Sequence, residues 1–225
     1  MTETRAEKLA RYHHVRYIGA KIQTEAVEFS HPRLFDDYAR RIGLDFIGWS
    51  LAGDPMGRAM LEDLVLYGQR PGGTRAIDRY ANATRLPAGS DEALVLDACR
   101  RARVSVFTVE ALHLPAGLRI KDIWSGETRV LMDESMESAR PIGMMFYARL
   151  RAVDDFVMSS RLMLPVTFEL LEPAFKRRPP AKGIKPPAWF QDARTTMAVY
   201  RVAVESGVAG RVEFRKPFPE SQVAA

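Results

Sequence analysis

Acidic side chains gather in one stretch near the middle of the chain, and their chemistry suits general acid–base catalysis or the binding of a hard metal ion. The carboxylates of this stretch are Asp122, Glu127, Asp133, Glu134 and Glu137. We predict Asp122 and Glu127 as structural or ligand carboxylates. Strand alternation puts Asp122 on the face of Leu118 and Ile120, and a carboxylate that faces a core must be hydrogen-bonded. We expect backbone N–H groups of the turn at 125–126 to be the donors.

Cations and prolines gather nearer to the C-terminus. Residues 176–225 carry ten Lys and Arg against four Asp and Glu, whereas the rest of the chain is nearly neutral. The cations could contact nucleic-acid phosphates or an acidic protein, and two aromatic rings just beyond them could stack on bases. A solvated linker is the alternative, with the two rings on the apolar face of a helix. The binding residues predicted here are Lys176, Arg177, Arg178, Lys182, Lys185, Trp189 and Phe190.

The other reactive residue types do not form workable groups. His13 and His14 are neighbours, so on a helix their side chains point about 100° apart and cannot bind one ion together. Cys99 is the single cysteine and lies in an apolar helical stretch, so we expect it to be buried. No serine or cysteine lies in a recognisable nucleophile elbow. We therefore predict no metal site and no cofactor, and we assign no catalytic residue.

Methionine is enriched in the segment 104–167. Six of the ten methionines lie there, namely Met132, Met136, Met144, Met145, Met158 and Met163. Methionine fills irregular gaps in cores, and it is also frequent on binding surfaces that accept varied partners. We expect core filling, with a groove for an apolar segment of a partner as the alternative.

The pattern of elements predicts an α+β fold. Helical periodicity runs through 5–29 and returns in shorter helices up to residue 102. Their predicted caps are Ser30, Asp54, Thr74 and Ser90. Five β-branched and aromatic runs follow, and helices are expected over 165–175 and 189–204. The predicted parts are a helical region at 1–103, a small antiparallel β-sheet or barrel at 104–167, and C-terminal helices with a basic Pro-rich linker (176–187) and a tail at 168–225.

The composition is that of an ordinary folded protein. The chain has 225 residues, of which 47% are hydrophobic and 27% charged, with a net charge of +5. No run approaches the roughly 18–20 apolar residues that a spanning helix needs, and the charged N-terminus is not a secretory signal. The single cysteine excludes an intramolecular disulfide. We expect a cytoplasmic protein without a membrane contact.

The β-rich segment also resembles a known group of proteins. The resemblance rests on Phe107 and Val109, residues 117–122, Ser125-Gly126-Glu127, Val130, Glu134, Ser135, Gly143, residues 148–150 and the upstream residues 77–80. This layout resembles uncharacterised bacterial proteins in which a helical N-terminal half precedes a small β domain. Some of them carry a C-terminal SEC-C zinc motif, which this chain lacks because it has one cysteine. The similarity covers roughly residues 30–165 and implies a fold, with no catalytic residue to transfer.

Three functions follow from these patterns. The first is a non-catalytic interaction or regulatory protein that binds a protein partner through the β segment and the last helix; a homo-oligomer is compatible with it. The alternative is a nucleic-acid-binding protein that uses the basic linker, with retention on DNA or RNA that falls steeply with salt. The third is an enzyme, which predicts a concave pocket where Asp122, Glu127 or Arg149 converge.

Overall fold

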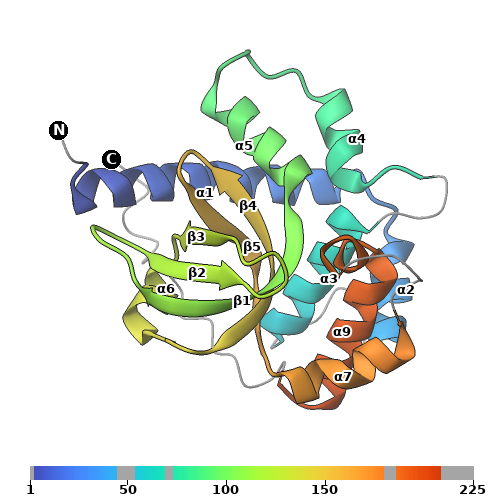
Figure 1. The fold of residues 1–225 in the computed structure, drawn as a ribbon. Coiled ribbons are helices and arrows are strands. Elements are labelled where there is room, and N and C mark those ends of the chain that lie inside the picture. The colour runs from blue at the N-terminus through green and yellow to red at the C-terminus, as the bar shows by residue number, and fades with distance from the viewer. Residues whose placement is uncertain (1–2, 45–53, 69–72, 180–185, 209–225) are drawn as a thin grey trace.

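The computed structural model describes residues 3–44, 54–68, 73–179 and 186–208, and it confirms the α+β fold (Figure 1). The strands are β1 (Arg103–Leu112), β2 (Leu118–Asp122), β3 (Thr128–Leu131), β4 (Met145–Val153) and β5 (Phe156–Val166). The helices are α1 (Arg5–Val27), α2 (Arg33–Ile42), α3 (Pro55–Tyr67), α4 (Ala76–Ala83), α5 (Asp91–Arg101), α6 (Glu134–Ala139), α7 (Phe168–Arg177), α8 (Pro186–Phe190) and α9 (Ala193–Glu205).

The strands close into a small barrel in the order β1-β2-β3-β5-β4, with β4 returning to β1. The predicted barrel is therefore confirmed, but its strands are not all antiparallel. β3 and β5 run parallel and meet at a single residue pair, Leu131 with Val157. The chain passes through α6 between β3 and β4, so β5 arrives beside β3 in the same direction. The barrel is consequently only weakly closed between these two strands.

Capping side chains explain where several helices begin. The side chain of Asp54 accepts a hydrogen bond from the Gly57 N–H, and that of Ser90 accepts one from the Ala93 N–H, as predicted. The predicted caps at Ser30 and Thr74 are wrong, because α2 starts after Pro32 and α4 after Arg75, without a side-chain cap. The sequence pattern did not predict α6. Asp133 caps this helix, so part of the acidic stretch builds a helix start.

Two predicted C-terminal boundaries shift in the structure. The strand β5 extends through Pro165 to Val166, so α7 begins only after its cap Thr167. The predicted helix 189–204 is interrupted, because Asp192 starts α9 by accepting a hydrogen bond from the Arg194 N–H. Trp189 and Phe190 belong to the separate short helix α8. Half of the predicted linker (180–185) and the tail beyond residue 208 lie outside the described residues.

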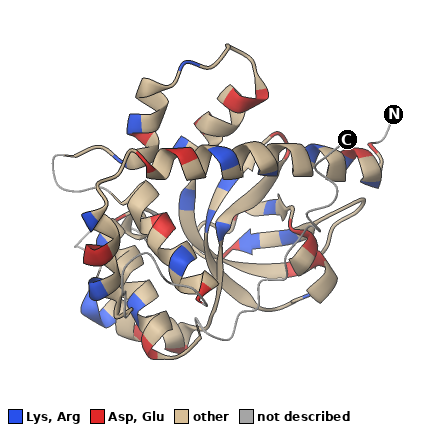
Figure 2. Cartoon of the chain, turned by 180° about the vertical axis from the view of Figure 1, so that it is seen from behind, with Lys and Arg blue, Asp and Glu red and all other residues tan. Residues whose placement is uncertain are grey.

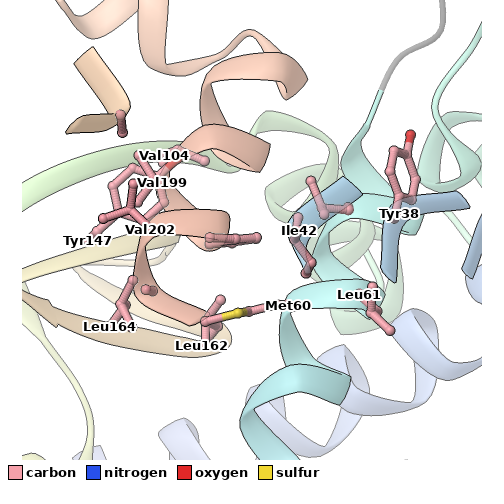
Figure 3. Packing of buried hydrophobic residues seen from close by; sticks show 14 of the residues in the cluster. Tyr38, Ile42, Met60, Leu61, Val104, Tyr147, Leu162, Leu164, Val199 and Val202 are labelled. Carbon is pink, nitrogen blue, oxygen red and sulfur yellow. The ribbon is translucent and has the colours of Figure 1, made fainter. Parts of the chain in front are cut away.

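Three apolar clusters hold the molecule together. The first fills the barrel and includes Phe107, Leu118 and Phe146. The second joins the outer face of β1, β4 and β5 to α2, α3 and α7–α9 (Figure 3). The third lies under α1, α4 and α5 on another side of the barrel (Figure 1). Helices from both ends of the chain thus cover one central barrel.

Helix α1 crosses the barrel and carries charged residues along its length (Figure 2), and its first half forms ion pairs with the barrel. Lys8 Nζ lies 2.5 Å from a carboxylate oxygen of Asp155, and Arg11 Nε lies 2.8 Å from one of Asp154, both in the β4–β5 turn. Arg11 also reaches Asp91 at the start of α5, with 2.7 Å between Nη1 and Oδ2. These contacts tie α1 to two elements that are distant in sequence.

The contact of Asp91 with α1 predicts a pH dependence of stability. The hydrogen bond from Arg11 lowers the pKa of Asp91. Its contribution to stability is therefore present above the unfolded-state pKa and is lost as the pH falls through the lower folded-state pKa. The carboxylate is about one-third exposed, so we expect Asp91→Asn to cost roughly 0.5–1 kcal/mol at pH 7. Urea unfolding from pH 7 to pH 2 should show a flatter acid dependence for this variant.

Asp97→Asn is the matched control, because Asp97 pairs within its own helix with Arg101. We expect it to change stability by no more than about 0.5 kcal/mol. Equal costs for the two substitutions would show that the contact between α1 and α5 adds nothing beyond a local helix pair.

Candidate functional site

Asp122 has the structural role that the sequence predicted. Its Oδ1 accepts hydrogen bonds from the backbone N–H groups of Trp124 and Ser125, each at 2.9 Å. Its Oδ2 accepts a hydrogen bond from the hydroxyl of Ser105 on β1. One predicted donor is corrected, because the N–H of Gly126 donates to the backbone carbonyl of Asp122 instead. The carboxylate therefore holds the β2–β3 turn against β1.

Asp122 and Glu127 also line one pocket of about 410 Å³ at the end of the barrel where β1 begins. Four apolar side chains form much of its lining, namely Phe107, Ile120, Leu150 and Val157. Three arginines complete it on the charged side, namely Arg101, Arg103 and Arg129. We call this the barrel pocket. It brings together two of the three residues that the enzyme hypothesis named.

Strand alternation explains why the barrel is hollow at this end. Phe107 belongs to the interior cluster, so Ser105 and Arg103 face the interior as well. Ser105 is small and hydrogen-bonded to Asp122, which is the last residue of β2. These polar side chains leave the end of the barrel unfilled, whereas the rings of Phe107 and Phe146 fill its interior further in. The pocket is thus a consequence of polar residues at inward positions.

Arg149 lies elsewhere, in a buried polar network outside the barrel. Its Nε and Nη2 donate to the two carboxylate oxygens of Asp63, at 2.8 and 3.1 Å. The hydroxyls of Tyr200 and Ser160 donate to the same carboxylate, at 2.9 and 3.3 Å. The guanidinium carbon of Arg149 also lies 4.3 Å from the centre of the Tyr67 ring. Burial raises the pKa of Tyr200 well above its usual value, so its hydroxyl stays a donor.

A second buried arginine explains a glycine in α1. Arg151 is 2% exposed and donates from Nη1 to the Sγ of Cys99 at 3.3 Å, and Cys99 is buried as predicted. A Cβ atom at position 19 would collide with the Arg151 guanidinium, so Gly19 makes room for it. The sequence offered one signal for both arginines, which is their alternation within an otherwise apolar strand.

The predicted basic site does not form a free cationic surface in the described residues. Lys176 pairs with Glu172 at 2.9 Å, Arg177 with Glu205 at 2.8 Å, and Arg178 with Asp192 at 3.5 Å. Lys182 and Lys185 lie outside the described residues.

The two aromatic residues of that predicted site lie inside the fold. Trp189 is 7% exposed and Phe190 is fully buried. The Phe190 ring packs against Trp124 and Tyr147, with ring centres 5.9 and 5.8 Å apart. In this arrangement neither ring is available to stack on bases. Both rings are buried as the alternative expected, but they belong to α8 and not to the final helix on whose apolar face it placed them.

The methionines mostly fill cores. The buried ones are Met132, Met136, Met158 and Met163, none more than 9% exposed. Met144 differs, because nearly half of it is exposed just before β4 begins. Core filling is therefore confirmed for four of the six, and a methionine-lined groove is not formed by them.

Exposed apolar side chains gather at the end of the barrel opposite the pocket. The described residues include seven exposed large hydrophobics, and four of them lie here: Leu112, Leu114, Ile142 and Met144. Leu114 is the most exposed of the seven, at 85%. The N–H of Gly143 donates to the carbonyl of Val109, which holds the 142–144 loop against β1, the strand that ends at Leu112. We call these four side chains the apolar end.

The charges bordering the apolar end are unevenly paired. Glu110 pairs with Arg119 at 3.1 Å, and Glu137 pairs with Arg5 at 2.6 Å. Arg140 is exposed at the end of α6, two residues before Ile142, and has no ion-pair partner in the described part of the chain. The uncompensated charge at this border is therefore positive.

The described residues contain neither a metal-binding group nor a membrane-spanning helix. None of the His, Cys, Asp and Glu side chains in these ranges form a group of three that could hold a metal ion. No helix in the same ranges is both long and apolar enough to cross a membrane.

The strand order and the single parallel pair define a five-stranded Greek-key barrel of the OB type, here enclosed by helices. Residues 6–168 match the model of a family of unknown function, DUF7986, so the chain belongs to that family. No curated protein and no solved structure matches the chain. The family match ends at the first residue of α7, although α7–α9 complete the second apolar cluster.

Proposed function

We propose that this chain is a non-catalytic interaction protein that binds a protein partner at the apolar end of its barrel. The observation that carries the proposal is that four of the seven exposed large apolar side chains of the described residues lie at one end of the barrel. Apolar exposure concentrated in one region is typical of interaction sites, whereas scattered single residues are not. The predicted partner class is kept, while the proposed surface moves from the β segment and the last helix as a whole to the apolar end of the barrel.

The energy available at this surface is sufficient for specific binding. Fully burying a Leu, Ile or Met side chain contributes about 1.5–3 kcal/mol relative to leaving it exposed. The exposed fractions run from 42% for Leu112 to 85% for Leu114, so a partner could bury a large share of each. The four side chains can therefore act as the anchors of a partner segment.

The border charge selects the chemistry of the partner. Arg140 is the uncompensated charge beside the anchors, since Glu110 and Glu137 are already paired. A partner with acidic residues next to its apolar residues would pair with Arg140, whereas a basic partner would be repelled. We therefore propose a segment of another protein in which apolar residues are flanked by Asp or Glu.

Selection from a displayed peptide library with the full chain as bait tests this proposal. We expect enriched peptides to combine apolar residues with Asp or Glu. Leu114→Ser and Ile142→Ser should each weaken their binding by about tenfold or more, since removing a central anchor costs at least 1–2 kcal/mol. Arg140→Glu should weaken the acidic peptides further, mainly through the association rate. Fluorescence anisotropy with the selected peptides measures each change.

Tyr17→Ser is the matched control, because Tyr17 is 66% exposed on α1, away from the apolar end. It should leave peptide affinity unchanged. The proposal fails if Leu114→Ser and Ile142→Ser bind as well as the unchanged protein, or if the enriched peptides are basic. It also fails if these side chains bind lipid vesicles rather than peptides.

The nucleic-acid alternative has weaker support in the described residues. OB-type barrels can bind oligonucleotides over strands two and three. Here the exposed residues of those strands are Arg119, Lys121, Thr128 and Arg129. None of these is an aromatic residue on which bases could stack. Arg119 and Arg129 are also paired with Glu110 and Glu127.

A further inference from the structure

We propose that the barrel pocket is a second, separate binding site, and that its ligand is an oxyanion joined to a compact apolar group. The anionic part would be a carboxylate or a phosphate. This site lies at the end of the barrel away from the apolar end, so the proposal does not depend on the partner described above. It rests on the shape, the lining and the charges of the pocket.

The size and lining of the pocket suit a small organic molecule. Its volume of about 410 Å³ falls within the range of small-molecule sites, roughly 300–1,000 Å³. Phe107, Ile120 and Val157 lie at its inner side and are themselves part of the barrel interior. A compact apolar group placed against them would continue the packing of the barrel and would be removed from water.

Arg103 supplies the group that would bind the anion. It is the first residue of β1, it is exposed, and it lines the pocket. Arg103 has no ion-pair partner among the described residues. The other two arginines of the lining are paired, Arg101 with Asp97 at 2.5 Å and Arg129 with Glu127. Its planar guanidinium can bind a carboxylate or a phosphate through two parallel hydrogen bonds.

Neither carboxylate of the lining forms an ion pair with Arg103. Asp122 accepts three hydrogen bonds within the protein, and Glu127 is paired with Arg129. Arg101 and Arg129 are compensated by Asp97 and Glu127, so the remaining charges of the lining are the Arg103 guanidinium and the hydrogen-bonded Asp122 carboxylate. An anion bound at Arg103 would therefore meet a guanidinium without an ion-pair partner among the described residues, with an apolar wall behind it.

Chemical-shift mapping of the full chain with four small probes tests the proposal. Phenyl phosphate and benzoate carry both required parts, inorganic phosphate lacks the apolar part, and benzyl alcohol lacks the charge. We expect the first two to shift amides of residues 103–107 and 150–152 saturably. Inorganic phosphate and benzyl alcohol should each bind at least about tenfold more weakly, because each loses one kind of contact.

Two variants locate the binding. Arg103→Ala should weaken phenyl phosphate and benzoate by about tenfold or more, while Arg33→Ala, an exposed arginine on α2, should leave them unchanged. Ala152→Phe places a ring at the pocket wall and should also block binding. Both variants should still bind the peptides selected at the apolar end, which keeps the two proposals distinguishable.

Three results would contradict an anion-binding site in the barrel pocket. Absence of pocket shifts with phenyl phosphate and benzoate up to about 10 mM would exclude a specific site of this class. Equal binding of benzyl alcohol would show an apolar cavity without anion recognition. Unchanged affinity in Arg103→Ala would remove the assigned role of Arg103.

Discussion

Replacing Asp63 by alanine is expected to destabilise the protein by about 3–5 kcal/mol, because it leaves Arg149 buried without a counter-charge. Asp63 is 3% exposed and Arg149 8% exposed, so water cannot replace the lost partner. The substitution also removes the acceptor of the Tyr200 and Ser160 hydroxyls. Urea unfolding followed by circular dichroism measures the change as a lower midpoint with a similar slope.

A double variant separates the charge effect from loss of packing. Asp63→Leu with Arg149→Met replaces the ion pair by apolar side chains, and such exchanges are often neutral or stabilising. We expect the double variant to be more stable than Asp63→Ala, whose cost comes mainly from the unpaired arginine. Tyr200→Phe should cost only about 1 kcal/mol, since one hydrogen bond is lost and the charges remain paired.

A cost of less than about 1 kcal/mol for Asp63→Ala would contradict the prediction that Asp63 stabilises the fold by compensating the buried charge of Arg149. A cost that small is in the range of an exposed ion pair. The same conclusion would follow if the double variant were the less stable of the two. Either result would mean that the guanidinium finds another partner or reaches water when Asp63 is absent.

Much of the fold follows from local patterns in the sequence. The helical period of α1, the caps at Asp54 and Ser90, and the β-branched runs of the barrel each act over a few residues, so they could be read directly. The parallel pairing of β3 with β5 could not be predicted in this way. It depends on one contact, Leu131 with Val157, between strands separated by α6 and β4.

The candidate sites were less predictable because they depend on which side chains the fold brings together. The hydrogen-bonded role of Asp122 followed from strand alternation. The barrel pocket also depends on alternation. That Arg103 lines this pocket could not be predicted, because it depends on the pairing of β1 with β4, which places Arg103 opposite Leu150. The basic segment shows the reverse case, because composition cannot reveal that Arg177 pairs with Glu205 on α9.

The segment beyond the family match forms part of the core. Phe190 lies in α8, is fully buried and packs against Tyr147 of the barrel. The side-chain amide of Gln191 binds both backbone groups of Val104, with its Nε2 donating to the Val104 carbonyl at 2.8 Å. The helices α7–α9 therefore cover an apolar face of β1, β4 and β5 that would otherwise meet water.

A single ring in this segment should consequently carry a large share of the stability. We expect Phe190→Ala to cost about 3–5 kcal/mol, from lost apolar burial and from the cavity left beside Tyr147. Phe168→Ala is the matched control, because Phe168 is 52% exposed and should cost less than about 1 kcal/mol. Urea unfolding of both variants gives the comparison. Similar costs for the two would mean that α8 is not packed on the barrel, and that the region 6–168 holds its core without it.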